Sequence, residues 1–117
     1  MELTSHQTDG ILHITTRLIG DDCIIEYHNK EDKRHRENGP AIKANIKEQN
    51  NNEYCEWWNN GKLVAIFNKN KDAFLKSNDG THDSLYKIKI PEQLKGSEKN
   101  FSLNDIDSFN ELVLENS

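Results

Sequence analysis

The stretch EYCEWWNNGKLVAIF, residues 53–67, decides the fold of this chain. The runs on either side of its centre have the length and the period-two pattern of half-buried β-strands. Between them stands Asn60-Gly61, a pair that favours a tight type I′ turn because both central residues of that turn need positive φ. We therefore expect an antiparallel hairpin here.

The same alternation extends outward along the chain. In residues 42–46, for example, Ile42, Ala44 and Ile46 alternate with Lys43 and Asn45. The connections between such segments are short, and short loops cannot make parallel crossovers. The sequence therefore predicts a meander of about five or six antiparallel strands, at 12–18, 23–27, 42–46, 54–58, 63–67 and 86–90. Residues 68–83 are polar and predict a long loop or a short helical turn.

At the C-terminus the period changes to that of a helix over about residues 103–114. Ser102 and Asp105 have the spacing of a capping box at its start. The apolar positions that would face the sheet are Leu103, Ile106, Phe109, Leu112 and Val113. The predicted fold class is therefore α+β and mainly β, a single domain over 1–117 with its hairpin sheet at 10–90 and one C-terminal helix.

Composition limits the size of the core and the class of protein. Of 117 residues, 33% are hydrophobic and 30% are charged, so the core must be small. No stretch approaches the ~20 apolar residues of a membrane span, and the start at Met1 lacks the features of a signal peptide. We expect a cytoplasmic protein without a membrane partner.

The formal net charge is −5, and residues 72–117 carry most of the acidic surplus, with 5 bases against 9 acids. The densest basic cluster is Lys30, Lys33, Arg34 and Arg36. Glu31 and Asp32 lie within it, and interleaved acids weaken phosphate binding, which depends on net neutralisation of backbone charge. Direct nucleic-acid binding is therefore an alternative that the sequence disfavours.

Catalytic and metal-binding patterns are weak. Cys23, His28, His35 and Cys55 could supply zinc ligands, but no Cys or His pair has the local spacing of a half-site. Both cysteines lie in apolar strand patterns, which do not activate a thiolate. The alternative reading is a small metal-dependent nuclease or hydrolase that uses His28, His35 and nearby acids. We predict no cofactor, no metal and no enzymatic activity.

Two segments, 34–42 (RHRENGPAI) and 56–63 (EWWNNGKL), resemble one unit of the repeat in MORN-repeat-variant proteins. The resemblance covers about residues 23–67 and implies hairpins stacked in series; many members of that family are antitoxins of toxin–antitoxin pairs. The chain holds one full unit, with Val64-Ala65 in place of a second His-Arg. The open end of such a short stack must be covered by the N-terminal strand, the C-terminal helix, a second copy or a partner.

Candidate partner contacts follow from residue type and position. Adjacent tryptophans point to opposite faces of a strand, so one of Trp57 and Trp58 is a candidate anchor for a partner. Arg34 and Arg36, predicted on one strand face, suit bidentate carboxylate pairing. The acids of the predicted helix could mimic a phosphate backbone. The predicted partner-binding residues are Arg34, His35, Arg36, Trp57, Trp58, Asp105, Asp107 and Glu111.

Together these patterns predict a non-enzymatic protein-binding module that neutralises a protein partner. The partner is a toxin, or a host defence effector if the protein is a phage-encoded inhibitor such as an anti-CRISPR. Abundant Asn, Lys and Ile suggest an AT-rich genome, so we expect a bacterial cell or a phage-infected host. An uncovered strand edge would also permit a homodimer.

Overall fold

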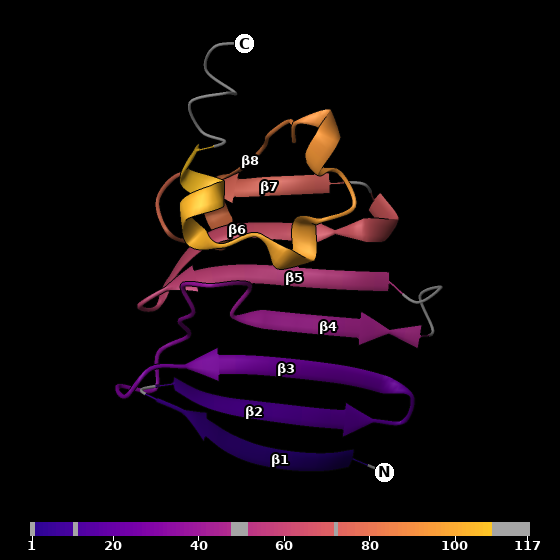
Figure 1. Ribbon diagram of the computed structural model, residues 1–117, viewed down its shortest axis with the longest axis vertical. Helices are drawn as coiled ribbons and strands as arrows, with labels where there is room; N and C mark the ends of the chain where they lie inside the picture. Colours follow the sequence, from indigo (N-terminus) through magenta and orange to yellow (C-terminus); the bar gives the residue numbers. More distant parts are fainter. Residues whose placement is uncertain (1, 11, 48–51, 72, 109–117) are drawn as a thin grey trace.

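The computed structural model describes residues 2–10, 12–47, 52–71 and 73–108. They form one eight-stranded antiparallel sheet in which each strand pairs with the next along the chain (Figure 1). β1 and β8 lie at its two ends. The strands are β1 Glu2–Asp9, β2 Leu12–Ile19, β3 Asp22–His28, β4 Ile42–Ile46, β5 Asn52–Asn59, β6 Lys62–Asn68, β7 Ala73–Ser77 and β8 Leu85–Lys87.

The predicted meander and its C-terminal helix are confirmed, but five or six strands was too few. β1 was missed because Leu3 is its only large apolar residue. β7 was missed because it lies within 68–83, whose polar composition indicates a loop; short 3₁₀ turns flank it at Lys69–Lys71 and His82–Ser84. The last predicted strand is also shorter, since β8 ends at Lys87 and 88–90 continue into the core.

The β5–β6 hairpin turns at Asn60-Gly61 as the sequence predicts. Asn60 has φ of 49° and Gly61 of 85°, so both residues occupy the left-handed region that a type I′ turn needs. The register shifts between Trp57 and Trp58, which marks a β-bulge just before the turn. A bulge increases local twist, and here it lies at the strand end that carries both tryptophans.

Register assigns every strand residue to one of two faces, because directly paired residues share a face. We call the covered face the one that carries Cys55, Trp57 and Phe67, and the open face the one that carries Glu56 and Ile66. The C-terminal segment, 88–108, crosses β5, β6 and β7 on the covered face (Figure 1). In the described part of the chain, no segment crosses β1, β2 or β3.

The hydrophobic core is confined to one half of the sheet. The members of its main cluster come from β5 onward, Ala41 and Ile42 are buried at the start of β4, and none of the residues 2–34 whose burial is described is buried. Val64, Leu94 and Leu103 pack against this core. Its buried members are Cys55, Trp57, Ala65, Phe67, Phe74, Ile88, Ile90, Phe101 and Ile106. The chain therefore folds around a small core that joins strands β5–β7 to the C-terminal segment.

Trp57 lies at the centre of this core. Its side chain is 0% exposed, its Nε1 donates a hydrogen bond to the Phe101 carbonyl at 2.7 Å, and its ring lies 5.2 Å from that of Phe74. A buried indole needs a partner for its N–H, and the C-terminal segment supplies it. One side chain thus joins sheet and C-terminal segment by both packing and hydrogen bonding.

The C-terminal helix is described over 103–108. The predicted capping box is confirmed: the Ser102 amide donates to Asp105 Oδ2 at 3.0 Å, and the Asp105 amide donates to Ser102 Oγ at 3.2 Å. The buried Lys76 ammonium of β7 donates to the Ile106 carbonyl at 3.5 Å. Burial lowers the Lys76 pKa, against the opposing effect of Asp107. The rest of the predicted helix lies outside the described residues.

Trp57→Phe is expected to lower the free energy of unfolding by about 2–4 kcal/mol, because it removes the buried hydrogen bond from Nε1 to the Phe101 carbonyl and opens a cavity. Trp58→Phe, the matched control on the open face, is expected to cost only about 1 kcal/mol. Urea denaturation followed by circular dichroism measures both. Equal losses for the two variants would contradict the central place given to Trp57.

Candidate protein-binding surface

The loop between β3 and β4 is tied to the β5–β6 turn. The Gly61 amide donates to the Arg34 carbonyl at 2.9 Å, and the Arg36 amide donates to the Trp58 carbonyl at 3.3 Å. Asn29 Nδ2 also donates to Asn60 Oδ1 at 3.0 Å. These contacts place residues 34–36 between the ends of β3 and β5. The loop therefore has a fixed position relative to both tryptophans.

His35 is a structural residue of this junction. It is 7% exposed, and its Nδ1 accepts a hydrogen bond from the Asn60 amide at 3.0 Å. Since a backbone amide can only donate, Nδ1 must be the unprotonated ring nitrogen. The buried imidazole holds the turn and exposes little surface in this structure, and its role as a partner contact stays a prediction.

Arg34 and Trp58 form a stacked pair on the open face. The Arg34 guanidinium carbon lies 5.1 Å from the centre of the Trp58 ring, within the range of a cation–π contact. His82 packs on the same indole, with the ring centres 5.7 Å apart. Trp58 Nε1 donates to Glu56 Oε1 at 2.8 Å. Trp58 is half-buried, so these contacts fix a large aromatic side chain at the surface.

Glu56 organises the base of this pair. Glu56 is 8% exposed, and its carboxylate accepts from Tyr54 Oη at 2.5 Å as well as from Trp58. His82 Nε2 lies 3.9 Å from Oε2. Burial and the bond to Glu56 raise the pKa of Tyr54, so the phenol keeps the proton that it donates. We call these five residues, Arg34, Tyr54, Glu56, Trp58 and His82, the Arg34–Trp58 surface.

Arg36 lies on the other side of the sheet. Its guanidinium carbon is 4.1 Å from the centre of the Tyr27 ring, and Nη1 donates to the Pro40 carbonyl at 3.3 Å. Register places Tyr27 on the covered face and Trp58 on the open face. The prediction that Arg34 and Arg36 share a strand face is therefore wrong. Apart from a bridge between His28 and Arg34, the segment pairs with no strand as a ladder, so strand alternation does not apply to it.

The other predicted contacts do not form one surface. Trp57 is completely buried, so it cannot touch a partner in this structure, and Trp58 is the outward member of the pair. Asp105 is exposed but serves as the helix cap. Asp107 is exposed beside Lys76. Glu111 lies outside the described residues.

The candidate metal and catalytic residues do not converge. Register places Cys23 and Cys55 on the covered face but His28 on the open face, where Nε2 lies 3.7 Å from Glu26. Within the described ranges, no group of three or more His, Cys, Asp or Glu side chains could hold a metal ion. Burial raises the pKa of the Cys55 thiol to about 12, which keeps it protonated and unreactive at neutral pH.

The comparisons with known proteins give no relative. No family model, curated protein or solved structure matches this chain. The resemblance to MORN-repeat-variant proteins over residues 23–67 therefore stays a prediction. In the residues described, no helix is long and apolar enough to cross a membrane.

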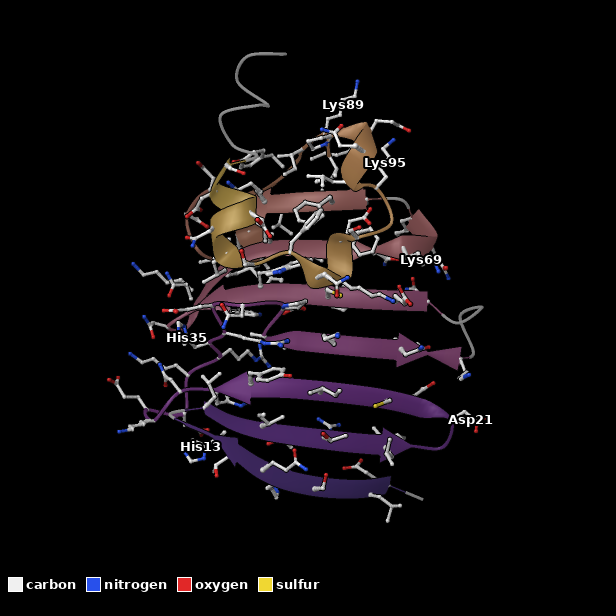
Figure 2. The ribbon with its side chains drawn as sticks, in the orientation of Figure 1. His13, Asp21, His35, Lys69, Lys89 and Lys95 are labelled. Carbon is white, nitrogen blue, oxygen red and sulfur yellow. The ribbon has the colours of Figure 1, made fainter. Side chains whose placement is uncertain are left out.

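A second surface feature lies beside β6, β7, β8 and the segment that follows β8. A hollow of about 380 Å³ is lined by apolar side chains that include Phe67 and Ile88, by Lys87, Lys89 and Lys95, and by Glu98. Lys69, Lys89 and Lys95 all lie near this end of the molecule (Figure 2). The charge count along the sequence hid this basic rim, because the same third of the chain carries the acidic surplus.

The sequence missed part of the Arg34–Trp58 surface. Tyr54, Glu56 and Trp58 alternate along β5 and so share a face, a signal that the spacing already contained. His82 gave no such signal. His82 lies in the segment 68–83, for which the sequence predicts only a loop or a short helical turn. The Leu63 amide of β6 donates a hydrogen bond to the Gly80 carbonyl of this segment at 2.9 Å, which holds it near the strand.

The Cys55 thiol is expected to resist iodoacetamide in the folded protein at pH 8, whereas the half-buried Cys23 reacts.

The raised pKa of Cys55 also makes the stability of the fold depend on pH. The contribution of the Cys55 thiol to the free energy of unfolding is fully present below its ordinary pKa of 9.0 and is lost as pH rises towards about 12. The reason is that the thiol ionises more easily in the unfolded chain than in the folded protein. Tyr54 acts in the same direction. Peptide mapping and urea denaturation at several pH values measure both effects, and equal labelling of the two thiols would contradict this account.

Proposed function

We propose that this protein is a non-enzymatic protein-binding module that neutralises a protein partner, acting through the Arg34–Trp58 surface. One observation carries the proposal: Trp58 is held at the surface by contacts with Arg34 and His82 and is hydrogen-bonded to a buried carboxylate. Trp and Arg are the residue types most enriched among the side chains that dominate protein–protein affinity.

The pre-ordered geometry supports binding rather than mere exposure. Ordering a flexible side chain on association costs about 0.5–1.5 kcal/mol, and the contacts to Trp58 meet that cost within the free protein. The indole and the guanidinium together offer apolar area and directional donors. A partner that presents a carboxylate beside an apolar side chain would match both.

Two further observations support a role without catalysis. The protonated Cys55 thiol is no nucleophile at neutral pH. His35 and Glu56, the buried groups that resemble an acid–base pair by type, are both occupied by structural hydrogen bonds. The sequence resemblance favours a toxin as the partner, and the AT-rich composition favours a host defence effector of a phage-infected cell.

Affinity capture from bacterial lysate tests the proposal with immobilised wild-type protein, Trp58→Ala and Arg34→Ala. Wild type is expected to retain a protein at micromolar concentration, and Trp58→Ala to weaken the retention by at least about tenfold, a loss of roughly 1.4 kcal/mol. Lys33→Ala is the matched control: Lys33 is exposed on the same loop, and its ammonium pairs with Glu31 at 3.3 Å.

Retention of no protein, or equal retention by all four proteins, would refute the proposal. Cleavage of nucleic acid or of generic hydrolase substrates that His28→Ala abolishes would instead establish the enzyme alternative. Salt-sensitive retention of DNA or RNA would establish the nucleic-acid alternative.

A further inference from the structure

β1 presents a long and regular open edge. It pairs with β2 without a register shift from Glu2 to Asp9, and the sheet order places it at the end of the sheet. In an antiparallel ladder, alternate residues turn their N–H and C=O groups towards the neighbouring strand. The other residues of β1 therefore turn theirs away from β2, where another strand can bind them.

The two edges of the sheet differ in how they are protected. β8 has three residues, and Lys87, Lys89 and Pro91 stand in or just after it. Short length, lysine and proline are the features that prevent edge pairing. β1 has eight residues and contains no lysine and no proline. The contrast indicates that the β1 edge is built to be paired.

The apolar side chains around β1 are also left uncovered in the single chain. Leu3 is 58% exposed and its cross-strand partner Leu18 is 42% exposed. Both lie on the covered face, in the half of the sheet that the C-terminal segment does not reach. Extension of the sheet past β1 would bring neighbouring side chains over Leu3, which in the single chain faces solvent.

We propose that two copies of this chain pair through β1, antiparallel and around a two-fold axis that passes beside Ser5. Paired residues must share a face, so the axis must pass beside a residue and not between two. With the axis at Ser5, residues 2–8 of the two copies overlap, and Leu3 lies opposite Gln7 of the second copy. Glu2 then lies opposite Thr8 of the second copy.

The two neighbouring registers are less favourable. An axis at Thr4 shortens the overlap to residues 2–6. An axis at His6 places the two imidazoles directly opposite each other and sets Leu3 against Asp9 of the second copy. Only the axis at Ser5 combines a long overlap with the absence of like groups that can carry charge in opposed positions.

This pairing makes one continuous sheet from the two copies. Because the axis is perpendicular to the sheet, both open faces lie on the same side, and the two Arg34–Trp58 surfaces stand at separate places along it. Such a dimer presents two equal binding surfaces in the same direction. The pairing itself does not depend on the proposed function.

Sedimentation analysis across a range of concentrations tests the pairing with the intact chain. Wild type is expected to be dimeric, and Ser5→Lys to weaken the dimer by at least about tenfold, because it places two ammonium groups opposite each other at the axis. Ser5 pairs with the neutral Thr16 within the chain, so the fold should tolerate the change. Asn78→Lys, in an exposed turn, is the matched control.

Cysteine crosslinking tests the register. Ser5→Cys is expected to form an intermolecular disulfide on mild oxidation, because residues opposed at the axis have Cα atoms about 4.5–5.5 Å apart. Gln7→Cys is the control: the two introduced residues would lie about four strand positions apart, roughly 13 Å, too far to bond. Peptide mapping distinguishes these bonds from any at the native cysteines.

A monomeric wild type at every concentration would overturn the proposal, as would an unchanged dimer in Ser5→Lys or equal crosslinking at both positions. A monomer whose capture of a partner is lost in Ser5→Lys would assign the β1 edge to a strand of that partner. That outcome would overturn the dimer and leave the proposed function standing. Loss of capture in Trp58→Ala with an intact dimer would support both proposals independently.

Discussion

The hydrogen bond from the Trp57 indole to the Phe101 carbonyl, inside the packing of Phe74 and Ile106, is the contact on which the rest of this structure depends. An apolar sheet face needs a second layer packed against it to form a core. The C-terminal segment provides the second layer, and Trp57 is where the two layers meet. Lys76 adds a second attachment at the Ile106 carbonyl.

The same strand places the candidate surface. Because neighbouring side chains of β5 point to opposite faces, the burial of Trp57 obliges Trp58 to point outward. The bulge opposite them, where Val64 of β6 is left unpaired, and the left-handed turn at Asn60-Gly61 lie at the strand end to which the 34–36 segment is hydrogen-bonded. The core on one face and the Arg34–Trp58 surface on the other thus depend on the same few residues.

Much of the fold followed from the sequence because its signals are local. The Asn60-Gly61 turn, the alternation of 42–46 and the Ser102–Asp105 cap each depend on residues close together in the chain. β1 was not predicted because its side chains are mostly polar and none of those described is buried, and β7 was not predicted because Phe74 and Leu75 stand in an otherwise polar stretch. The placement of Arg34 and Arg36 on opposite faces could not be predicted from the sequence. The loop takes its shape from contacts with Trp58 and Gly61, which are distant in the chain, so no local pattern indicates them.

The uneven core has a dynamic consequence. Backbone hydrogen bonds open locally with free energies that follow the burial around them, and β1–β3 have no buried side chain among those described. Their amides should exchange with solvent through small openings that leave β5–β7 intact. The N-terminal half of the sheet can then adjust its twist to an added strand while Trp57 keeps the other half closed, so stability and adaptability are assigned to different ends of one sheet.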